Sequence, residues 1–203
     1  MAAIVDKADV LKSVDGRILE LGCGDRKRHP SYIGVDILDY PAVDVVGDAF
    51  DVLSSIPDSA LAGVYSSHFF EHVGDVQKLL TELARVIRPG GRLDITVPHF
   101  SNPYYYSDLT HRRLYGLYSF SYWSVDPLLR RRVPTYQRDL AFELQSVRLR
   151  FKSPPPFVVR YALKRMFELL VNLSTWTQEF YEENLSQIVP CYELDFRLMR
   201  LGK

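Results

Sequence analysis

Two carboxylates flank a glycine turn near the start of the chain. Glu20 lies in the apolar run 18–21, the turn Gly22-Cys23-Gly24 follows it, and Asp36 ends a second apolar run. Strand, glycine turn, strand and acid is the arrangement with which an open α/β sheet binds a nucleoside-shaped ligand at the carboxyl ends of its strands. Glycine has no Cβ, so the backbone of the turn can lie against the ligand. The acid can accept hydrogen bonds from both ribose hydroxyls.

A polar segment further along the chain could remove a proton from a hydroxyl group of a bound molecule. Asp108, Thr110, His111, Arg112 and Arg113 lie in a loop after the apolar run 93–97. An imidazole that titrates near neutral pH suits removal of a hydroxyl proton, so His111 is a candidate base with Asp108 orienting its ring. A structural cluster of Asp, His and Arg that pins the loop explains the same residues at least as well.

A second histidine-containing segment follows the apolar run 61–65. The residues His68, Glu71 and His72 have the spacing i, i+3 and i+4, which could place three metal ligands on one helical face. Few other ligand residues lie near them in the sequence, and we predict no metal. Both histidines could instead satisfy hydrogen bonds at the start of a helix.

Three motifs carry a family resemblance. E-L-G-C-G at 20–24, H-x-x-E-H at 68–72 and R-V-I-R-P-G-G-R-L-D-I-T-V-P at 85–98 resemble the class I S-adenosylmethionine-dependent methyltransferases. Within these, the chain is similar to the small type 11 branch, which includes cell-surface sugar and polysaccharide enzymes. The pattern D-x-T-H-x-R at 108–113 resembles a block that type 11 enzymes carry at this place. The resemblance spans residues 15–125.

The resemblance implies a cofactor, S-adenosyl-L-methionine, and a set of contacts to it. Asp48 is expected to accept a hydrogen bond from the adenine amino group; capping of a helix is the alternative, and the surrounding motifs favour binding. Methyl transfer from a sulfonium needs no metal. The implied catalytic residues are His111 and Asp108. The implied cofactor-binding residues are Glu20, Gly22, Cys23, Gly24, Asp36, Ile37, Asp48, Ala49, Ser67 and His68.

The elements that must position these residues form an α/β fold. We expect a Rossmann-like, mostly parallel seven-stranded sheet with one antiparallel strand, which is the last one. The link from the glycine turn to Tyr32 is shorter than the dozen or so residues of a full crossover, so the first helix is one turn or absent. Hydrophobic spacing predicts strands at 18–21, 32–35, 43–46, 61–65, 93–97, 142–151 and 191–201, and helices at 3–13, 76–87, 157–175 and 176–188.

Length and composition indicate one domain, residues 1–203, with a helical insertion at about 154–189 before the last strand. The chain has 25 basic and 25 acidic residues, a balance that disfavours a general nucleic-acid binder. The two cysteines do not suggest a disulfide framework, and residues 1–14 contain no apolar signal-peptide core, so a cytoplasmic location is expected. No apolar run reaches the roughly 18 residues of a membrane span.

The predicted activity is methyl transfer to an acceptor nucleophile, a hydroxyl of a sugar or other small molecule. A catalytically inactive binding or scaffold subunit is one alternative, and an RNA methyltransferase, suggested by Arg130–Arg132, is another. A nicotinamide-dependent oxidoreductase should have a third glycine where Lys27 stands. The helical insertion is expected to cover the core or pocket; a homodimer contact and a peripheral contact with a membrane surface are the alternatives.

Overall fold

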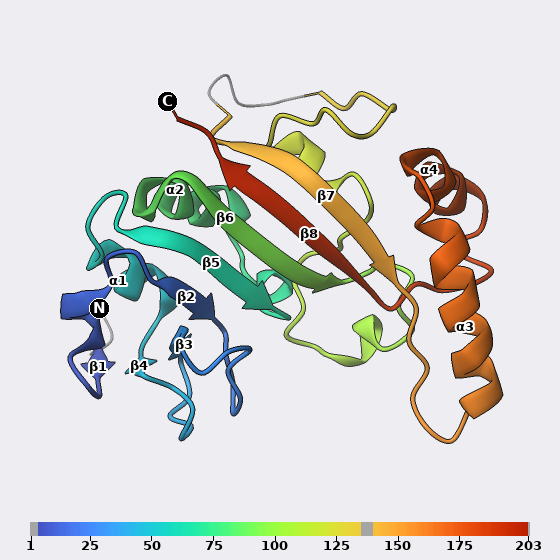
Figure 1. Ribbon diagram of the computed structural model, residues 1–203. Coiled ribbons are helices and arrows are strands. Elements are labelled where there is room, and N and C mark those ends of the chain that lie inside the picture. Colours follow the sequence, from blue (N-terminus) through green and yellow to red (C-terminus); the bar gives the residue numbers. More distant parts are fainter. Residues whose placement is uncertain (1–3, 135–139, 203) are drawn as a thin grey trace.

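A computed structural model describes residues 4–134 and 140–202, which contain an eight-stranded sheet of order β1-β4-β3-β2-β5-β6-β8-β7 (Figure 1). Neighbouring pairs from β4 to β6 are parallel, whereas β8 is antiparallel to β6 and β7. The predicted Rossmann-like sheet and its antiparallel last strand are therefore confirmed. The strands are β1 (Val5–Asp6), β2 (Ile18–Leu21), β3 (Ile33–Asp36), β4 (Val45–Val46), β5 (Leu61–Ser67), β6 (Ile87–Pro98), β7 (Phe142–Arg150) and β8 (Glu193–Arg200).

The N-terminal segment differs from the helix predicted over 3–13. Strand β1 pairs antiparallel with β4, which gives the sheet an eighth strand and a second antiparallel one. A short 3₁₀ turn, η1 (Val10–Ser13), follows it, and the Asp6 carboxylate accepts hydrogen bonds from the backbone N–H groups of Val10 and Leu11 at 2.8 and 2.9 Å. The prediction was wrong because pairing with an exposed sheet edge satisfies more backbone groups than a short isolated helix does. Residue 3 lies outside the described residues.

Helices cover one face of the sheet. Helix α2 buries Leu79, Leu80 and Leu83 at helical spacing, as predicted. Among residues 22–32, all of which the structure describes, no helix forms, so the predicted shortened first crossover is confirmed. The helices are α1 (Ala49–Ser54), α2 (Val76–Val86), α3 (Val158–Val171) and α4 (Thr175–Asn184), with 3₁₀ turns η2 (Phe70–His72), η3 (Tyr105–Ser107) and η4 (Ser119–Tyr122).

The two faces of the sheet have opposite character. On β6, Leu93, Ile95 and Val97 are buried on the side of α1 and α2, while Asp94 and Thr96 point the other way. That second face is turned toward the viewer in Figure 1 and carries no helix over β5, β6 and β8. A hollow of about 760 Å³ lies over it, lined largely by polar and charged side chains. A missing first crossover helix leaves this face open.

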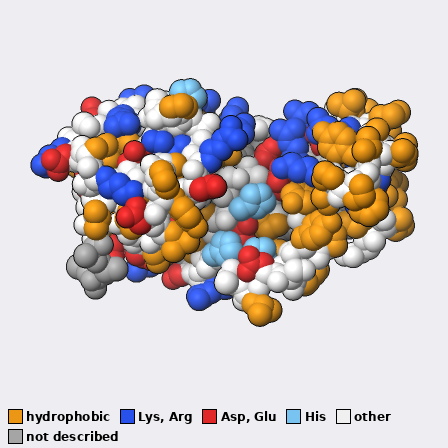
Figure 2. All heavy atoms as spheres, turned by 90° about the horizontal axis from the view of Figure 1, so that it is seen from below, with side chains coloured by type: hydrophobic (Ala, Val, Ile, Leu, Met, Phe, Trp, Pro, Cys, Tyr) orange, Lys and Arg blue, Asp and Glu red, His pale blue; other side chains and the backbone are white. Residues whose placement is uncertain are grey.

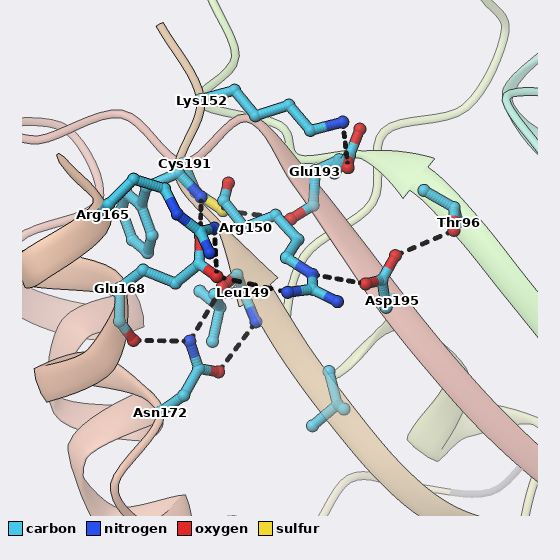
Figure 3. Close-up of polar contacts among 12 residues, drawn as sticks. Thr96, Leu149, Arg150, Lys152, Arg165, Glu168, Asn172, Cys191, Glu193 and Asp195 are labelled. Carbon is cyan, nitrogen blue, oxygen red and sulfur yellow. Dashed lines mark hydrogen bonds and ion pairs between the residues drawn. The ribbon is translucent and has the colours of Figure 1, made fainter. Parts of the chain in front are cut away.

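The insertion between β7 and β8 is tied to the sheet by one buried acid. Glu168 of α3 is fully buried and accepts hydrogen bonds from Phe151 N at 2.9 Å, Arg165 at 2.7 Å and Arg150 at 3.3 Å (Figure 3). Asn172 bonds both backbone groups of Leu149. Helices α3 and α4 are thereby fixed beyond the β7 edge, at the positions predicted for the helical insertion.

Candidate functional site

Four adjacent parallel strands, β4, β3, β2 and β5, have their carboxyl ends on the same side of the sheet. The chain runs outward from β2 to β3 and β4 and then returns to β5 on the other side of β2. The order of strands therefore reverses between β2 and β5, which is where open α/β sheets bind ligands. The predicted site residues at or after the carboxyl ends of the four strands therefore lie on one side of the sheet. They are Gly22, Cys23, Gly24, Asp36, Ile37, Asp48, Ala49, Ser67 and His68.

The glycine turn is held against β3. Gly22 and Gly24 have φ values of 69° and 58°, in the left-handed region that favours glycine. Gly24 N donates to Oδ2 of Asp36 at 2.8 Å, and Leu38 N donates to Oδ1 at 2.9 Å. Each carboxylate oxygen keeps a further lone pair for a ligand. The next side chain, Ile37, is apolar and 69% exposed, as a residue that packs on a ligand ring would be.

Glu20 lies beneath the link that follows the turn. Its side chain is buried, its Oε2 accepts a hydrogen bond from Arg28 N at 2.7 Å, and burial raises its pKa. Burial also raises the pKa of Cys23 to about 12, so this residue is a neutral thiol. In the structure Glu20 therefore fixes the backbone of the link at Arg28, and Cys23 packs against Gly34 of β3.

Asp48 is the N-cap of α1. Its Oδ1 accepts hydrogen bonds from Phe50 N at 2.8 Å and Asp51 N at 3.4 Å. The sequence interpretation favoured adenine binding over capping, and the structure shows the cap. Oδ2 accepts no hydrogen bond from the described residues, so a ligand contact remains a prediction for that oxygen.

His68 is a cation at the end of β5. Its φ is 54°, its Nδ1 lies 3.2 Å from Glu71, and its Nε2 lies 3.2 Å from Glu193 of β8. Lys152 pairs with the other oxygen of Glu193 at 2.5 Å. The hydrogen bonds to Glu193 and then Glu71 raise the pKa of His68 to about 9. Sequence reasoning missed Glu193, which lies 125 residues away, and no local pattern marks it.

The raised pKa of His68 makes stability depend on pH. The ordinary value is 6.5 and the folded value is about 9, so the stabilisation is complete below pH 6.5 and is lost as the pH rises toward 9. His68 is partly exposed, and solvent screening limits the effect to roughly 1 kcal/mol. Urea unfolding of the parent and His68→Gln at pH 6 and pH 9.5 checks this. Equal pH dependence of the two proteins would contradict it.

In the loop after β6, the ring of His111 is held by a different partner from the one predicted. The Nδ1 of His111 lies 2.9 Å from the carbonyl oxygen of Tyr105, which holds the ring. Oδ2 of Asp108 is 3.6 Å from Nε2, an ion-pair distance and not a hydrogen bond. Hydrogen bonds from Thr110 to Asp108 lower the pKa of that carboxyl. The expectation that Asp108 orients His111 is corrected: the Tyr105 carbonyl does so.

The three-residue metal grouping of His68, Glu71 and His72 does not form. The Nδ1 of His68 bonds Glu71, and its Nε2 bonds Glu193. His72 turns instead toward His111, with the ring centroids 4.9 Å apart. Figure 2 shows histidine side chains gathered with acidic ones in the central hollow of one face. His72 and His111 thus meet across segments 39 residues apart.

Residues 19–95 match the methyltransferase domain family, a stretch that runs from β2 into β6. No curated protein matches the sequence. Many solved structures share the fold, and three of them illustrate the likeness. An S-adenosylmethionine-dependent methyltransferase from Archaeoglobus fulgidus is 17% identical with a TM-score of 0.55, over 96% of this chain and 92% of that one.

The other two are equally distant in sequence. Phosphoethanolamine N-methyltransferase 2 of Haemonchus contortus is 15% identical with a TM-score of 0.52, over 96% of this chain and 52% of that one. A chain from a complex containing the Haloferax volcanii Trm112 methyltransferase activator is 14% identical with a TM-score of 0.54, over 98% of this chain and 89% of that one. These likenesses establish the fold, and the domain match adds the sequence signature. Residues 19–95 therefore carry the sequence signature of the methyltransferase domain, and the chain has the fold of solved S-adenosylmethionine-dependent methyltransferases.

Proposed function

We propose that the protein transfers a methyl group from S-adenosylmethionine to a hydroxyl of a sugar or other small molecule. The observation that carries the acceptor class is the loop after β6. Tyr104 and Tyr106 are exposed there, the intervening Tyr105 packs on His111 with ring centroids 4.6 Å apart, and exposed aromatic rings stack on sugar faces. Displacement at the sulfonium needs donor and acceptor to be aligned and water excluded.

The donor is proposed to lie along the edge where β2 to β5 end. Asp36 accepts the ribose hydroxyls, Ile37 and Ala49 pack on the adenine ring, and Oδ2 of Asp48 accepts from its amino group. Ser67 and His68 lie beside the methionine end, and Glu20 and Cys23 support the turn. The bonding of Gly24 N to Asp36 supports this assignment, because one carboxylate then joins turn and ligand.

Transfer of label from methyl-labelled S-adenosylmethionine to a panel of acceptors tests the acceptor class. The panel holds nucleotide-sugars, free glycans and transfer RNA. Label in the sugar fractions supports the proposal, and label in RNA alone would refute it. Two of the three arginine side chains already have partners, since the Arg131 guanidinium lies 5.0 Å from the centre of the Tyr118 ring and Arg132 donates to the Asp126 carbonyl oxygen at 2.7 Å, which disfavours the RNA alternative.

An apolar face on the helical insertion is the second feature that bears on function. Among the described residues no helix is long and apolar enough to cross a membrane. Figure 2 shows a continuous apolar surface over α3 and α4 bordered by basic side chains. Exposed large apolar residues there are Phe157, Val158, Val159, Tyr161, Leu163, Met166, Leu169, Leu170, Leu173, Trp176, Phe180 and Ile188.

We propose that this apolar face rests on an anionic lipid surface. Lys152, Arg160 and Lys164 border an adjoining pocket of about 480 Å³, whose other lining is mainly apolar. Anionic headgroups complement these cations, whereas a second copy of the same face would bring like charges together. A carrier lipid joined to a sugar by phosphate would suit both features.

Co-sedimentation with vesicles checks the apolar face. We expect the protein to bind phosphatidylglycerol-containing vesicles and not pure phosphatidylcholine ones. Val159→Glu and Leu170→Glu should abolish binding, since each puts a charge on an exposed apolar position. Leu109→Glu is the control, because Leu109 is 97% exposed on a different segment. If the protein dimerises in solution and binds neither kind of vesicle, the apolar face is a homodimer contact instead.

We propose a cytoplasmic location. Both cysteines, Cys23 and Cys191, are buried and unpaired, as in a reducing compartment. We also propose that residues 1–203 act as one methyltransferase domain, with the insertion as part of it. The contacts of Glu168 and Asn172 with β7 support this.

A further inference from the structure

Two histidines and one carboxylate from separate segments converge beside the end of β5. Glu71 and His72 come from η2, and His111 comes from the loop after β6. One ligand-capable atom from each lies within 4.8 Å of the others. We propose that these three residues form a binding site for a divalent transition-metal ion of the zinc class.

Glu71 has an unmatched oxygen. Its side chain is 1% exposed, and one oxygen, Oε1, lies 3.2 Å from His68 Nδ1. The other, Oε2, has no hydrogen-bond partner, and it is the one buried side-chain polar atom in that condition within the described residues. Burying a carboxylate oxygen without a partner is costly, so a bound cation would satisfy a group that the protein leaves open.

The hydrogen-bond partners of His72 and His111 determine which ring nitrogen of each histidine carries the hydrogen atom. The Nδ1 of His111 must donate to the Tyr105 carbonyl at 2.9 Å, because a carbonyl only accepts. Oγ1 of Thr110 donates to Asp108 at 2.6 Å and so accepts from Nδ1 of His72 at 2.9 Å. In the neutral form each ring then carries its lone pair on Nε2, as metal-binding histidines do when a backbone or hydroxyl oxygen holds the other nitrogen.

The segments that supply the ligands are fastened to each other. The carbonyl oxygen of Glu71 accepts hydrogen bonds from Arg112 N at 2.7 Å and Arg113 N at 3.2 Å. Two imidazoles and one carboxylate are a ligand set that zinc uses in sites with an open coordination position. Sequence spacing hid the set, because His111 lies far from the other two ligands.

The surrounding charges permit a cation. Glu71 and Asp108 are acidic, and Oδ2 of Asp108 is 3.6 Å from the Nε2 of His111. The His68 imidazolium faces Glu71 from the other side and offsets one of these charges. The competing arrangement is an ion pair between protonated His111 and Asp108. If an ion binds Nε2, His111 is a ligand and not the general base.

Metal titration of the whole, chelator-stripped protein tests the site. We expect calorimetry to show one Zn²⁺ per chain, and Co²⁺ to give the visible absorption of a low-coordinate site. His111→Gln and His72→Gln should each weaken Zn²⁺ at least about a hundredfold, since loss of a ligand exceeds loss of a supporting contact. His29→Gln, which changes an exposed histidine elsewhere, should bind like the parent.

Two outcomes would overturn the proposal. One is no uptake of Zn²⁺ by the parent protein, and the other is unchanged affinity in both His72→Gln and His111→Gln. Circular dichroism of each variant shows whether it is folded, and Glu71→Gln, nearly isosteric, gives a third ligand test. Because metal uptake is measured without donor or acceptor, failure here leaves the proposed methyl transfer standing.

Discussion

Asp36→Ala is expected to weaken binding of S-adenosylhomocysteine at least tenfold, or about 1.4 kcal/mol. The substitution removes the proposed ribose acceptor and also the hydrogen bonds from Gly24 N and Leu38 N that shape the turn. Isothermal titration calorimetry measures the effect.

Two control variants show whether the loss of affinity is specific to Asp36. Asp39→Ala removes a nearby exposed acid paired with Lys7 and should leave the affinity unchanged. His111→Ala should also keep donor affinity while it slows turnover, because His111 is placed on the acceptor side. Parent-like affinity in Asp36→Ala would mean that the donor does not contact the end of β3.

Gly22→Ala is expected to destabilise the protein by roughly 2–4 kcal/mol and to remove donor binding. The φ of Gly22 is 69°, and an added Cβ would lie 2.8 Å from Cβ of Phe69. The clash adds to the backbone strain, and relief would push the turn away from the proposed ligand edge. Urea unfolding and calorimetry together measure both effects.

Gly90→Ala is the matched control for backbone strain. Gly90 has φ 78°, and no atom lies within 4 Å of an added Cβ. We expect a loss of about 1 kcal/mol and no change in donor affinity. Equal destabilisation of the Gly22 and Gly90 variants would show that Phe69 yields, and that close packing at the turn is not needed.

The positions of most strands could be predicted because each carries its own local pattern. The apolar runs at β2 and β5 end in glycine or polar residues, and the short link after Gly24 left room for one helical turn at most. The N-terminal segment could not be predicted in this way. Its strand exists only through pairing with β4, which is a contact between distant segments.

Site residues that lie in one segment of the chain could be predicted from the sequence. Contacts between residues of two distant segments could not. Asp36 follows its strand directly and lies where expected. Glu193 reaches His68 only because β8 inserts beside β6, and His111 reaches His72 only because the loop folds back onto η2. The cap made by Asp48 could not be told from a binding role, because an acid before a helix looks the same in sequence whether it caps or binds.

Calorimetric titration of the purified protein with S-adenosylhomocysteine, with NAD as the control ligand, tests the central assignment most directly. We predict saturable binding of S-adenosylhomocysteine at one site per chain and no heat from NAD beyond dilution. Binding of NAD, or of neither ligand, would contradict the proposed donor site at the ends of β2 to β5. Binding of neither would favour a scaffold subunit that needs a partner to complete its site.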